Sequence, residues 1–208
     1  MKSLNAPSNQ PRDDDAGGVS RAGLFSRSLA VVGALGGAAF GAAELAAAPR
    51  SQASAARDRE ILNLALLVAR LQAAFYSEAL RGGKLSGEKR QFAQVAGGHE
   101  REHVKLLAGA LGSHAAKSPA FKFGDAVTDQ DKFIATAATL ESTSLAAYNG
   151  QGVNLTPATL AAAAKIVSVE ARHAAWARAI AGQLPAPDAV DAPITVSQAK
   201  KALAPFLS

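Results

Sequence analysis

Apolar residues recur at intervals of three and four positions along most of this chain, which is the period of an amphipathic α-helix. The pattern defines four long segments and one short segment, at residues 57–80, 86–111, 128–148, 156–181 and 197–203. Glycine follows each of the first three segments within two residues, as it does at many helix ends. The sequence therefore predicts an all-α fold, a bundle of four long helices with a short C-terminal helix.

Residues suited to helix N-termini stand at three of the predicted starts. Ser86 is the expected N-cap of the second helix, and Thr128 that of the third, with Asp131 three residues further on. In the fourth helix Pro157 takes the first position, where its missing N–H leaves no hydrogen bond unmade. These residues support the predicted boundaries.

The connection between the second and third segments is long. It runs from Gly112 to Val127, about 16 residues, and at roughly 3.3 Å per extended residue it could reach about 50 Å. A helix of about 24 residues is only about 36 Å long. The connection can therefore travel the whole length of the bundle and start the third helix parallel to the second. Two hairpins joined by one long crossover form a known bundle topology, which the sequence permits without requiring it.

Two copies of the pattern Glu-x-x-His carry the candidate chemistry. Glu100 and His103 lie in the second segment, and Glu170 and His173 lie in the fourth. Residues three apart on a helix are neighbours on one face, so each pair presents a carboxylate and an imidazole in the same direction. Two such pairs that face each other would make a metal site.

The composition agrees with a helical bundle and narrows the chemistry. Of the 208 residues 49% are hydrophobic but only 5% are aromatic, so the apolar share is mostly Ala and Leu, which are strong helix formers. The chain has no cysteine, so metal ligands must be carboxylate or imidazole. The formal net charge is +5, but no Lys/Arg cluster is interleaved with aromatic residues, and we expect no nucleic-acid partner.

Four short stretches together carry a resemblance to a known family. They are Leu71–Tyr76, His99–His103, Leu140-Glu141 with Ala146–Tyr148, and Val169–His173. In this combination the chain resembles the ferritin-like superfamily, in particular the exported ferritin-like domain group that includes plant desiccation-related proteins. The resemblance covers about residues 57–182. It implies a ferritin-like four-helix bundle with a carboxylate-bridged pair of metal ions, usually iron, in its core.

The resemblance also implies a set of ligands. Glu100 and Glu170 would bridge the two ions, His103 and His173 would be the imidazole ligands, and Glu141 would be the carboxylate from the third helix. These oxygen and nitrogen ligands suit Fe or Mn and do not exclude Zn. Five of the six protein ligands are thereby assigned.

The sixth ligand is missing. Glu141 lies seven residues before Tyr148, whereas the residue seven positions before Tyr76 in the first helix is Ala69. Gln72, one turn further on, can supply a carbonyl oxygen but no charge, and whether it binds the metal stays open. We therefore expect one well-held ion and a weak or absent second one, which would impair two-electron chemistry. The tyrosines are expected to be packing residues.

The predicted function is that of an exported metal-binding protein with a degenerate di-metal site, in stress or desiccation protection. The alternatives are an active di-iron oxidase or peroxidase-type enzyme and a metal-free structural bundle. His99 also completes the pattern His-Glu-x-x-His of zinc proteases, but that interpretation leaves the second Glu-x-x-His unexplained. Replacing His99 would remove the metal of a protease, whereas the ferritin-like interpretation places His99 outside the ligands.

The first 55 residues differ from the rest and are interpreted as an export signal. A polar start precedes an Ala/Gly-rich apolar stretch at residues 29–43, and small-residue cleavage candidates follow at residues 46–48 and 53–55. We expect a periplasmic, extracellular or cell-envelope protein, membrane-anchored if the leader is retained and without stable membrane insertion once it is cleaved. Residues 56–182 would then form the bundle and residues 183–208 a C-terminal extension. A homo-oligomer stays open.

Overall fold

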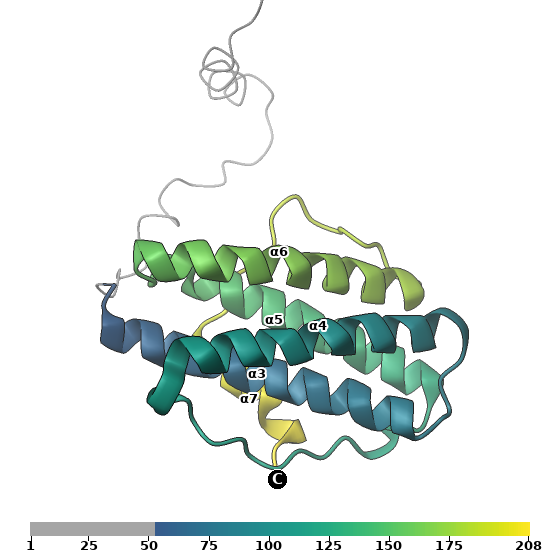
Figure 1. Ribbon diagram of the computed structural model, residues 1–208. Helices are drawn as coiled ribbons and strands as arrows, with labels where there is room; N and C mark the ends of the chain where they lie inside the picture. Colours follow the sequence, from purple (N-terminus) through teal and green to yellow (C-terminus); the bar gives the residue numbers. More distant parts are fainter. Residues whose placement is uncertain (1–52) are drawn as a thin grey trace, which may run out of the picture. The chain divides into compact units, whose positions relative to one another are not determined.

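The computed structural model describes residues 53–208, and this part of the chain is helical (Figure 1). The long helices are α3 (Ala55–Arg81), α4 (Gly87–Leu111), α5 (Gln130–Gly152) and α6 (Pro157–Ile180), followed by the short α7 (Val196–Leu203). Three single turns of 3₁₀-helix add Gly112–His114, Gly124–Val127 and Ala204–Phe206. The predicted all-α fold with a short C-terminal helix is confirmed. The predicted leader lies, apart from its last three residues, outside the described residues.

Helix α5 differs from its predicted bounds at both ends. Its N-cap is Asp129, one residue after the predicted Thr128, because the Asp129 carboxylate accepts the backbone N–H groups of Asp131 and Lys132 at 2.9 Å. At the other end the helix continues past the predicted stop at residue 148 to Gly152. The intervening Gly150 faces the backbone of Ile194, whose carbonyl oxygen would lie only 2.0 Å from a Cβ at that position. Glycine is needed there for close approach of the chain, not for helix termination.

Hydrogen bonds at the two ends of the bundle show how the helices run. At one end α4 and α5 begin side by side, since the Ser86 hydroxyl donates to Gln130 Oε1 at 2.9 Å. At the opposite ends of these helices, α3 and α6 begin together, and Asp58 accepts the backbone N–H of Thr156 at 2.9 Å. Helix α4 is therefore parallel to α5, and residues 112–129 cross the length of the bundle between them. The pairs α3–α4 and α5–α6 are the two hairpins (Figure 1).

The C-terminal segment fastens the crossover. The Lys122 N–H donates to the Phe206 carbonyl at 3.0 Å, and the Ser208 N–H donates to the Ala120 carbonyl at 3.1 Å. The Phe206 ring also contacts Phe123, with ring centroids 6.2 Å apart. The extension after α6 is thus part of the packing of the bundle.

The two largest apolar clusters of the interior lie on either side of a polar layer. One cluster is rich in aromatic residues and includes Tyr76, whereas the other is aliphatic and includes Ala69. Along α4, the buried Glu100 lies between Ala96 of the aromatic cluster and Leu107 of the aliphatic cluster. Among the described residues, no helix is both long enough and apolar enough to cross a lipid bilayer.

Candidate metal centre

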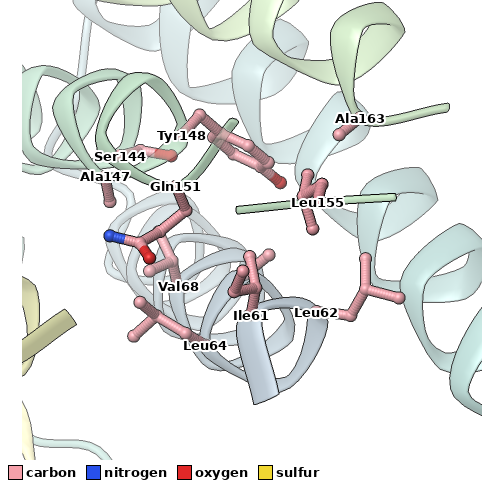
Figure 2. Close-up of a pocket in the computed structure, with 11 residues that line it drawn as sticks. Ile61, Leu62, Leu64, Val68, Ser144, Ala147, Tyr148, Gln151, Leu155 and Ala163 are labelled. Atoms are coloured by element: carbon pink, nitrogen blue, oxygen red, sulfur yellow. The ribbon is translucent and has the colours of Figure 1, made fainter. Parts of the chain in front are cut away.

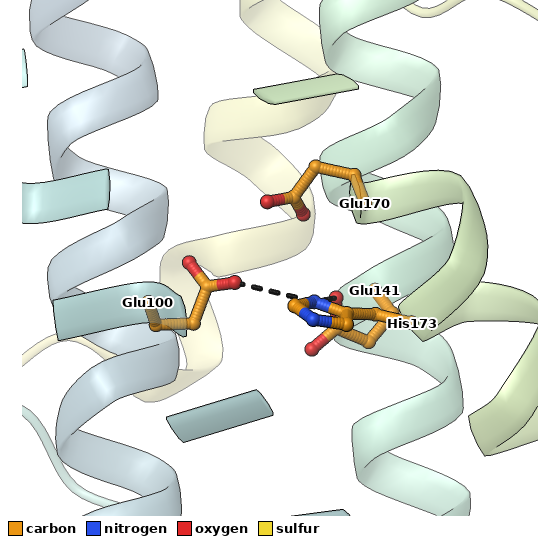
Figure 3. Close-up of side chains that lie close together, drawn as sticks. All are labelled: Glu100, Glu141, Glu170 and His173. Carbon is orange, nitrogen blue, oxygen red and sulfur yellow. Dashed lines mark ion pairs between the residues drawn. The ribbon is translucent and has the colours of Figure 1, made fainter. Parts of the chain in front are cut away.

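Four buried side chains from three helices converge in the polar layer. They are Glu100 of α4, Glu141 of α5, and Glu170 and His173 of α6. One potential ligand atom of each lies within 4.8 Å of the others, and Figure 3 shows the four side chains pointing toward one another. On α6 the spacing of three residues places the last two on one face of the helix. The structure thus brings together four of the five ligands predicted from the sequence.

The fifth predicted ligand, His103, lies beside this group. Its Nδ1 is 3.1 Å from Glu170 Oε1 and 3.4 Å from Glu100 Oε1. It is buried, like the two carboxylates that it contacts. His103 is therefore paired with the group but does not belong to the set of atoms that lie within 4.8 Å of one another.

Each of the four converging residues has one atom that is orphaned, meaning buried and without a hydrogen-bond partner among residues 53–208. These atoms are Glu100 Oε1, Glu141 Oε2, Glu170 Oε2 and His173 Nδ1. His173 Nδ1 lies 3.5 Å from both Glu100 Oε1 and Glu141 Oε2, an ion-pair distance (Figure 3). Buried polar atoms nearly always have partners, and three buried carboxylates need compensating charge. A cation among these atoms would satisfy all of them at once.

The donor set fits a first-row divalent metal. Three carboxylates and one imidazole offer hard oxygen ligands with one nitrogen, a combination that suits Fe or Mn and is compatible with Zn. Glutamates and histidines that project inward from the helices of a four-helix bundle are the usual way in which such a fold holds metal ions. The buried Glu/His group is thus compatible with metal binding.

The two histidines neutralise the group when it holds no metal. Burial lowers the pKa of His103 and of His173, but the surrounding glutamates outweigh burial and raise these pKa values to about 9 and about 10. Burial raises the pKa of Glu141 to about 7, and burial together with the charge of Glu100 raises that of Glu170. For Glu100 the pairing with both histidines outweighs burial and lowers the pKa. A metal ion must displace protons from this network.

Tyr76 takes a part in the site that the sequence analysis missed. Its hydroxyl on α3 donates a hydrogen bond to Glu141 Oε1, which leaves Oε2 facing His173. The ring also packs against Phe75 and Phe92, so the predicted packing role is only part of its contribution. A signal was present in the sequence, because Tyr76 follows Gln72 by one helical turn on the face that was expected to point at the site.

His99 is the second neighbour that contacts the site. Its Nδ1 lies 2.9 Å from Nε2 of His173, and the ring planes are only 12° apart. The centroids, at 5.1 Å, are much farther apart than the two nitrogens, so the rings meet edge to edge. This contact occupies Nε2 and leaves Nδ1 of His173 facing the carboxylates. His99 is outside the converging group, so the two histidines of His-Glu-x-x-His are not brought into one set of ligands.

Helix α3 contributes polar atoms of a different kind. Ala69, where the sixth ligand was expected, is buried in the aliphatic cluster. Within residues 53–208, no carboxylate from α3 joins the converging group. Gln72 is fully buried, and both its Oε1 and its Nε2 are orphaned.

An apolar pocket adjoins the site between α3, α5 and the start of α6 (Figure 2). Its lining includes Ser144, Tyr148 and Leu155. Ser144 connects the pocket to the site, because its side chain acts to lower the pKa of Glu170. The cavity volume of ≈ 20 Å³ is room for about one water molecule. This pocket therefore admits only very small molecules.

Fold and site together define the class of this protein: a four-helix bundle with a buried group of glutamates and a histidine between its helices. The family comparison agrees, since the ferritin-like domain family matches residues 57–183, more than half of the chain. The chain belongs to the ferritin-like domain family. A comparison of the sequence with curated proteins found no match.

Proposed function

We propose that this protein is an exported ferritin-like metal-binding protein that holds one divalent iron or manganese ion per chain, with zinc as a further candidate. The ligands would be Glu100, Glu141, Glu170 and His173, with His103 paired beside them. One observation supports this most strongly: each of the four ligands has an orphaned atom in the same buried space. A role in stress or desiccation protection is proposed on the resemblance described above.

The residues support one ion better than two. A second ion on the α3 side would find His103 and the bridging glutamates, but position 69 offers it only a methyl group. Bound iron or manganese would supply Lewis acidity and one-electron redox chemistry. The protein's own part is to fix the ligands: Tyr76 holds Glu141 from one side, and His99 holds His173 from the other. We therefore propose binding without two-electron turnover.

A metal-free structural bundle is the second candidate, and one observation favours it. His103 Nδ1 is 3.1 Å from Glu170 Oε1, and the raised pKa values of about 9 for His103 and about 10 for His173 let imidazolium groups neutralise the glutamates. In that function the network would only fill the core. The two candidates differ in whether the group takes up a metal ion at neutral pH.

Metal titration with elemental analysis tests the proposal. The full chain is titrated with Mn²⁺, Zn²⁺ and, without oxygen, Fe²⁺, and the bound metal is counted per chain. We expect one tightly held ion, lost in Glu141→Gln but kept in Glu102→Gln, whose exposed side chain pairs with Lys105 at 2.7 Å. Two tightly held irons would favour the di-iron enzyme instead. No bound ion would favour the metal-free bundle.

Export rests on the composition of residues 1–55 and is tested separately. The chain is expressed with its N-terminus intact in a host with a secretory pathway, and the cell fractions are examined by mass spectrometry. We propose a mature form in the periplasm, medium or cell envelope that begins after one of the small-residue candidates. An uncleaved chain in the membrane fraction would indicate a retained anchor. An uncleaved chain in the cytosol would contradict export.

A further inference from the structure

The side chain of Gln72 is buried in a way that calls for an explanation. It is 0% exposed, and neither Oε1 nor Nε2 finds a hydrogen-bond partner in the described part of the chain. The buried Gln151 of α5 differs, because its Nε2 donates to the Ile194 carbonyl at 3.3 Å and its Oε1 accepts from Asn154 at 3.3 Å. An unpaired buried amide destabilises a fold, so such a group indicates a partner that the protein chain does not supply.

The packing of α3 against α4 places Gln72 level with the metal centre. A Cβ added at Gly97 of α4 would lie 2.8 Å from Cβ of Tyr76, so these two positions face each other. The helices are antiparallel, and both rise 1.5 Å per residue. Moving four residues back along α3 to Gln72 therefore corresponds to moving four residues forward along α4, to the turn that contains Glu100 and His103.

The packing of α3 against α6 gives the same level independently. These helices are parallel, and Asp58 of α3 accepts a hydrogen bond from the Thr159 hydroxyl at 2.6 Å. Gln72 and His173 lie equally far along their helices from this contact. In addition, Gln72 shares a helix face with Tyr76, one turn away, and the Tyr76 hydroxyl reaches Glu141. Gln72 is thus at the height of the four converging ligands and on the face that turns toward them.

We infer that Gln72 is the metal ligand supplied by α3, through its amide oxygen Oε1, one helical turn from the position where a carboxylate is missing. An amide carbonyl is a hard, neutral oxygen ligand that suits Mn²⁺ and Fe²⁺. It adds coordination without adding negative charge, so it favours one divalent ion over two. This inference rests on the proposed function and names the group that sets the stoichiometry.

Two substitutions at position 72 test this inference in the full chain. The probe is Mn²⁺, and its free concentration is followed by electron paramagnetic resonance, which also detects magnetic coupling between two bound ions. Gln72→Leu should weaken Mn²⁺ binding by about 10-fold or more, the scale of effects around metal sites. Gln72→Glu restores a carboxylate on α3 and should bind a second Mn²⁺ with a coupled spectrum. If Gln72→Glu fails to fold, the nearly isosteric Gln72→Met replaces it and should weaken binding as the leucine does.

The matched control is Gln151→Leu, which removes a buried glutamine that has partners within the chain. It should keep the Mn²⁺ affinity and lower the unfolding temperature. Gln72→Leu should show the reverse, with an equal or higher unfolding temperature in EDTA, because it removes an unpaired amide. Wild type that binds one Mn²⁺ no more tightly than Gln72→Leu would overturn the inference and leave the proposed function standing. Wild type that binds neither Mn²⁺ nor Fe²⁺ would overturn both.

Discussion

Two groups of buried carboxylates, Asp58 by itself and the three glutamates of the metal centre, differ in whether their oxygens have hydrogen-bond partners. Near the start of α3, Asp58 accepts the Thr156 N–H at 2.9 Å and the hydroxyls of Thr156 and Thr159 at 2.5 and 2.6 Å. In the middle of the bundle, three glutamates each keep one orphaned oxygen. Burial is similar in the two groups, with all four side chains at most 7% exposed. The difference lies in whether the chain itself supplies the partners.

The comparison separates a structural carboxylate from one arranged for a ligand. Asp58 joins α3 to the first turn of α6, where it satisfies the Thr156 N–H and places a negative charge at a helix N-terminus. Both carboxylate oxygens of Asp58 therefore already have partners within the chain. The glutamates are held by Tyr76 and the histidines so that one oxygen of each stays unpaired toward a common space. Orphaned atoms therefore identify the site better than burial or charge alone.

Replacement of Glu100 should have the largest effect. Glu100→Gln removes the charge that faces both His103 and His173, so we expect metal affinity to fall by about 1,000-fold, equivalent to roughly 4 kcal/mol, the scale of breaking a buried ion pair. Titration with Mn²⁺ measures this loss of metal affinity. Asp58→Asn is the control and should leave metal affinity unchanged. If the two variants lost affinity equally, the distinction between the two groups would be wrong.

The two groups should also respond to pH with opposite signs. Burial raises the pKa of Asp58, but hydrogen bonds from Thr156 and Thr159 outweigh it and bring the pKa below 3.8. Its stabilisation is therefore present above pH 3.8 and lost as the pH falls below that. The pKa values of His103 and His173 are raised from 6.5 to about 9 and about 10, so their stabilisation is present below pH 6.5 and lost as the pH rises through 9 to 10.

Denaturant unfolding in EDTA measures this contrast. Between pH 6.5 and 10 the metal-free protein should lose on the order of a few kcal/mol of unfolding free energy. Asp58→Asn should keep this alkaline loss and weaken the acid one. Metal should oppose the alkaline loss, because its binding is favoured by deprotonated imidazole. An unfolding free energy that stays constant from pH 6.5 to 10 would show that His103 and His173 do not carry charge in the metal-free protein.

Truncation of Asp58 tests the structural group. Asp58→Ala leaves the Thr156 N–H and two hydroxyls without their acceptor, so we expect a loss of about 2–3 kcal/mol in unfolding free energy. The loss should be the same with Mn²⁺ or with EDTA. Glu60→Ala on the same helix is the matched control: its half-exposed pair with Arg57 is worth at most about 1 kcal/mol. A loss seen only with metal would place Asp58 in the site.

Much of the fold was predictable because its signals are local. Helix periodicity and the spacing of Glu-x-x-His depend on a few neighbouring residues, which is why the four helices and the convergence of Glu100 with Glu170 and His173 could be predicted. The C-terminal end of α5 was predicted too early because a tertiary contact decides it: Gly150 lets the backbone of Ile194 approach the helix closely and does not end the helix. Whether the converging residues bind metal stays a prediction.

The contacts around the site were harder to predict because they depend on how helices rotate against each other. The hydrogen bond from Tyr76 to Glu141 joins α3 to α5, and that between His99 and His173 joins α4 to α6. No spacing within one helix contains this information. The same holds for His103, which lies beside the converging group although its pattern is identical to that of His173.

The smallest of these effects is expected at His99. His99→Ala removes the ring whose Nδ1 lies 2.9 Å from His173 Nε2, but every proposed ligand remains. Partners that orient a ligand histidine typically contribute about 10-fold in metal affinity. We therefore expect Mn²⁺ binding about 10-fold weaker than in wild type, far short of the loss in Glu100→Gln. His99→Gln should recover part of it, since its amide oxygen can accept the Nε2–H of His173.

The nitrogen chemical shifts of His173 give a second measurement, because they report which ring nitrogen carries the proton. In the metal-bound protein we expect the proton on Nε2 in wild type and in His99→Gln, and a mixture of tautomers in His99→Ala. An effect as large as that of Glu100→Gln would mean that His99 is itself a ligand, as the His-Glu-x-x-His pattern of zinc proteases requires. Unchanged affinity and an unchanged tautomer would mean that the buried carboxylates orient His173 without help from His99.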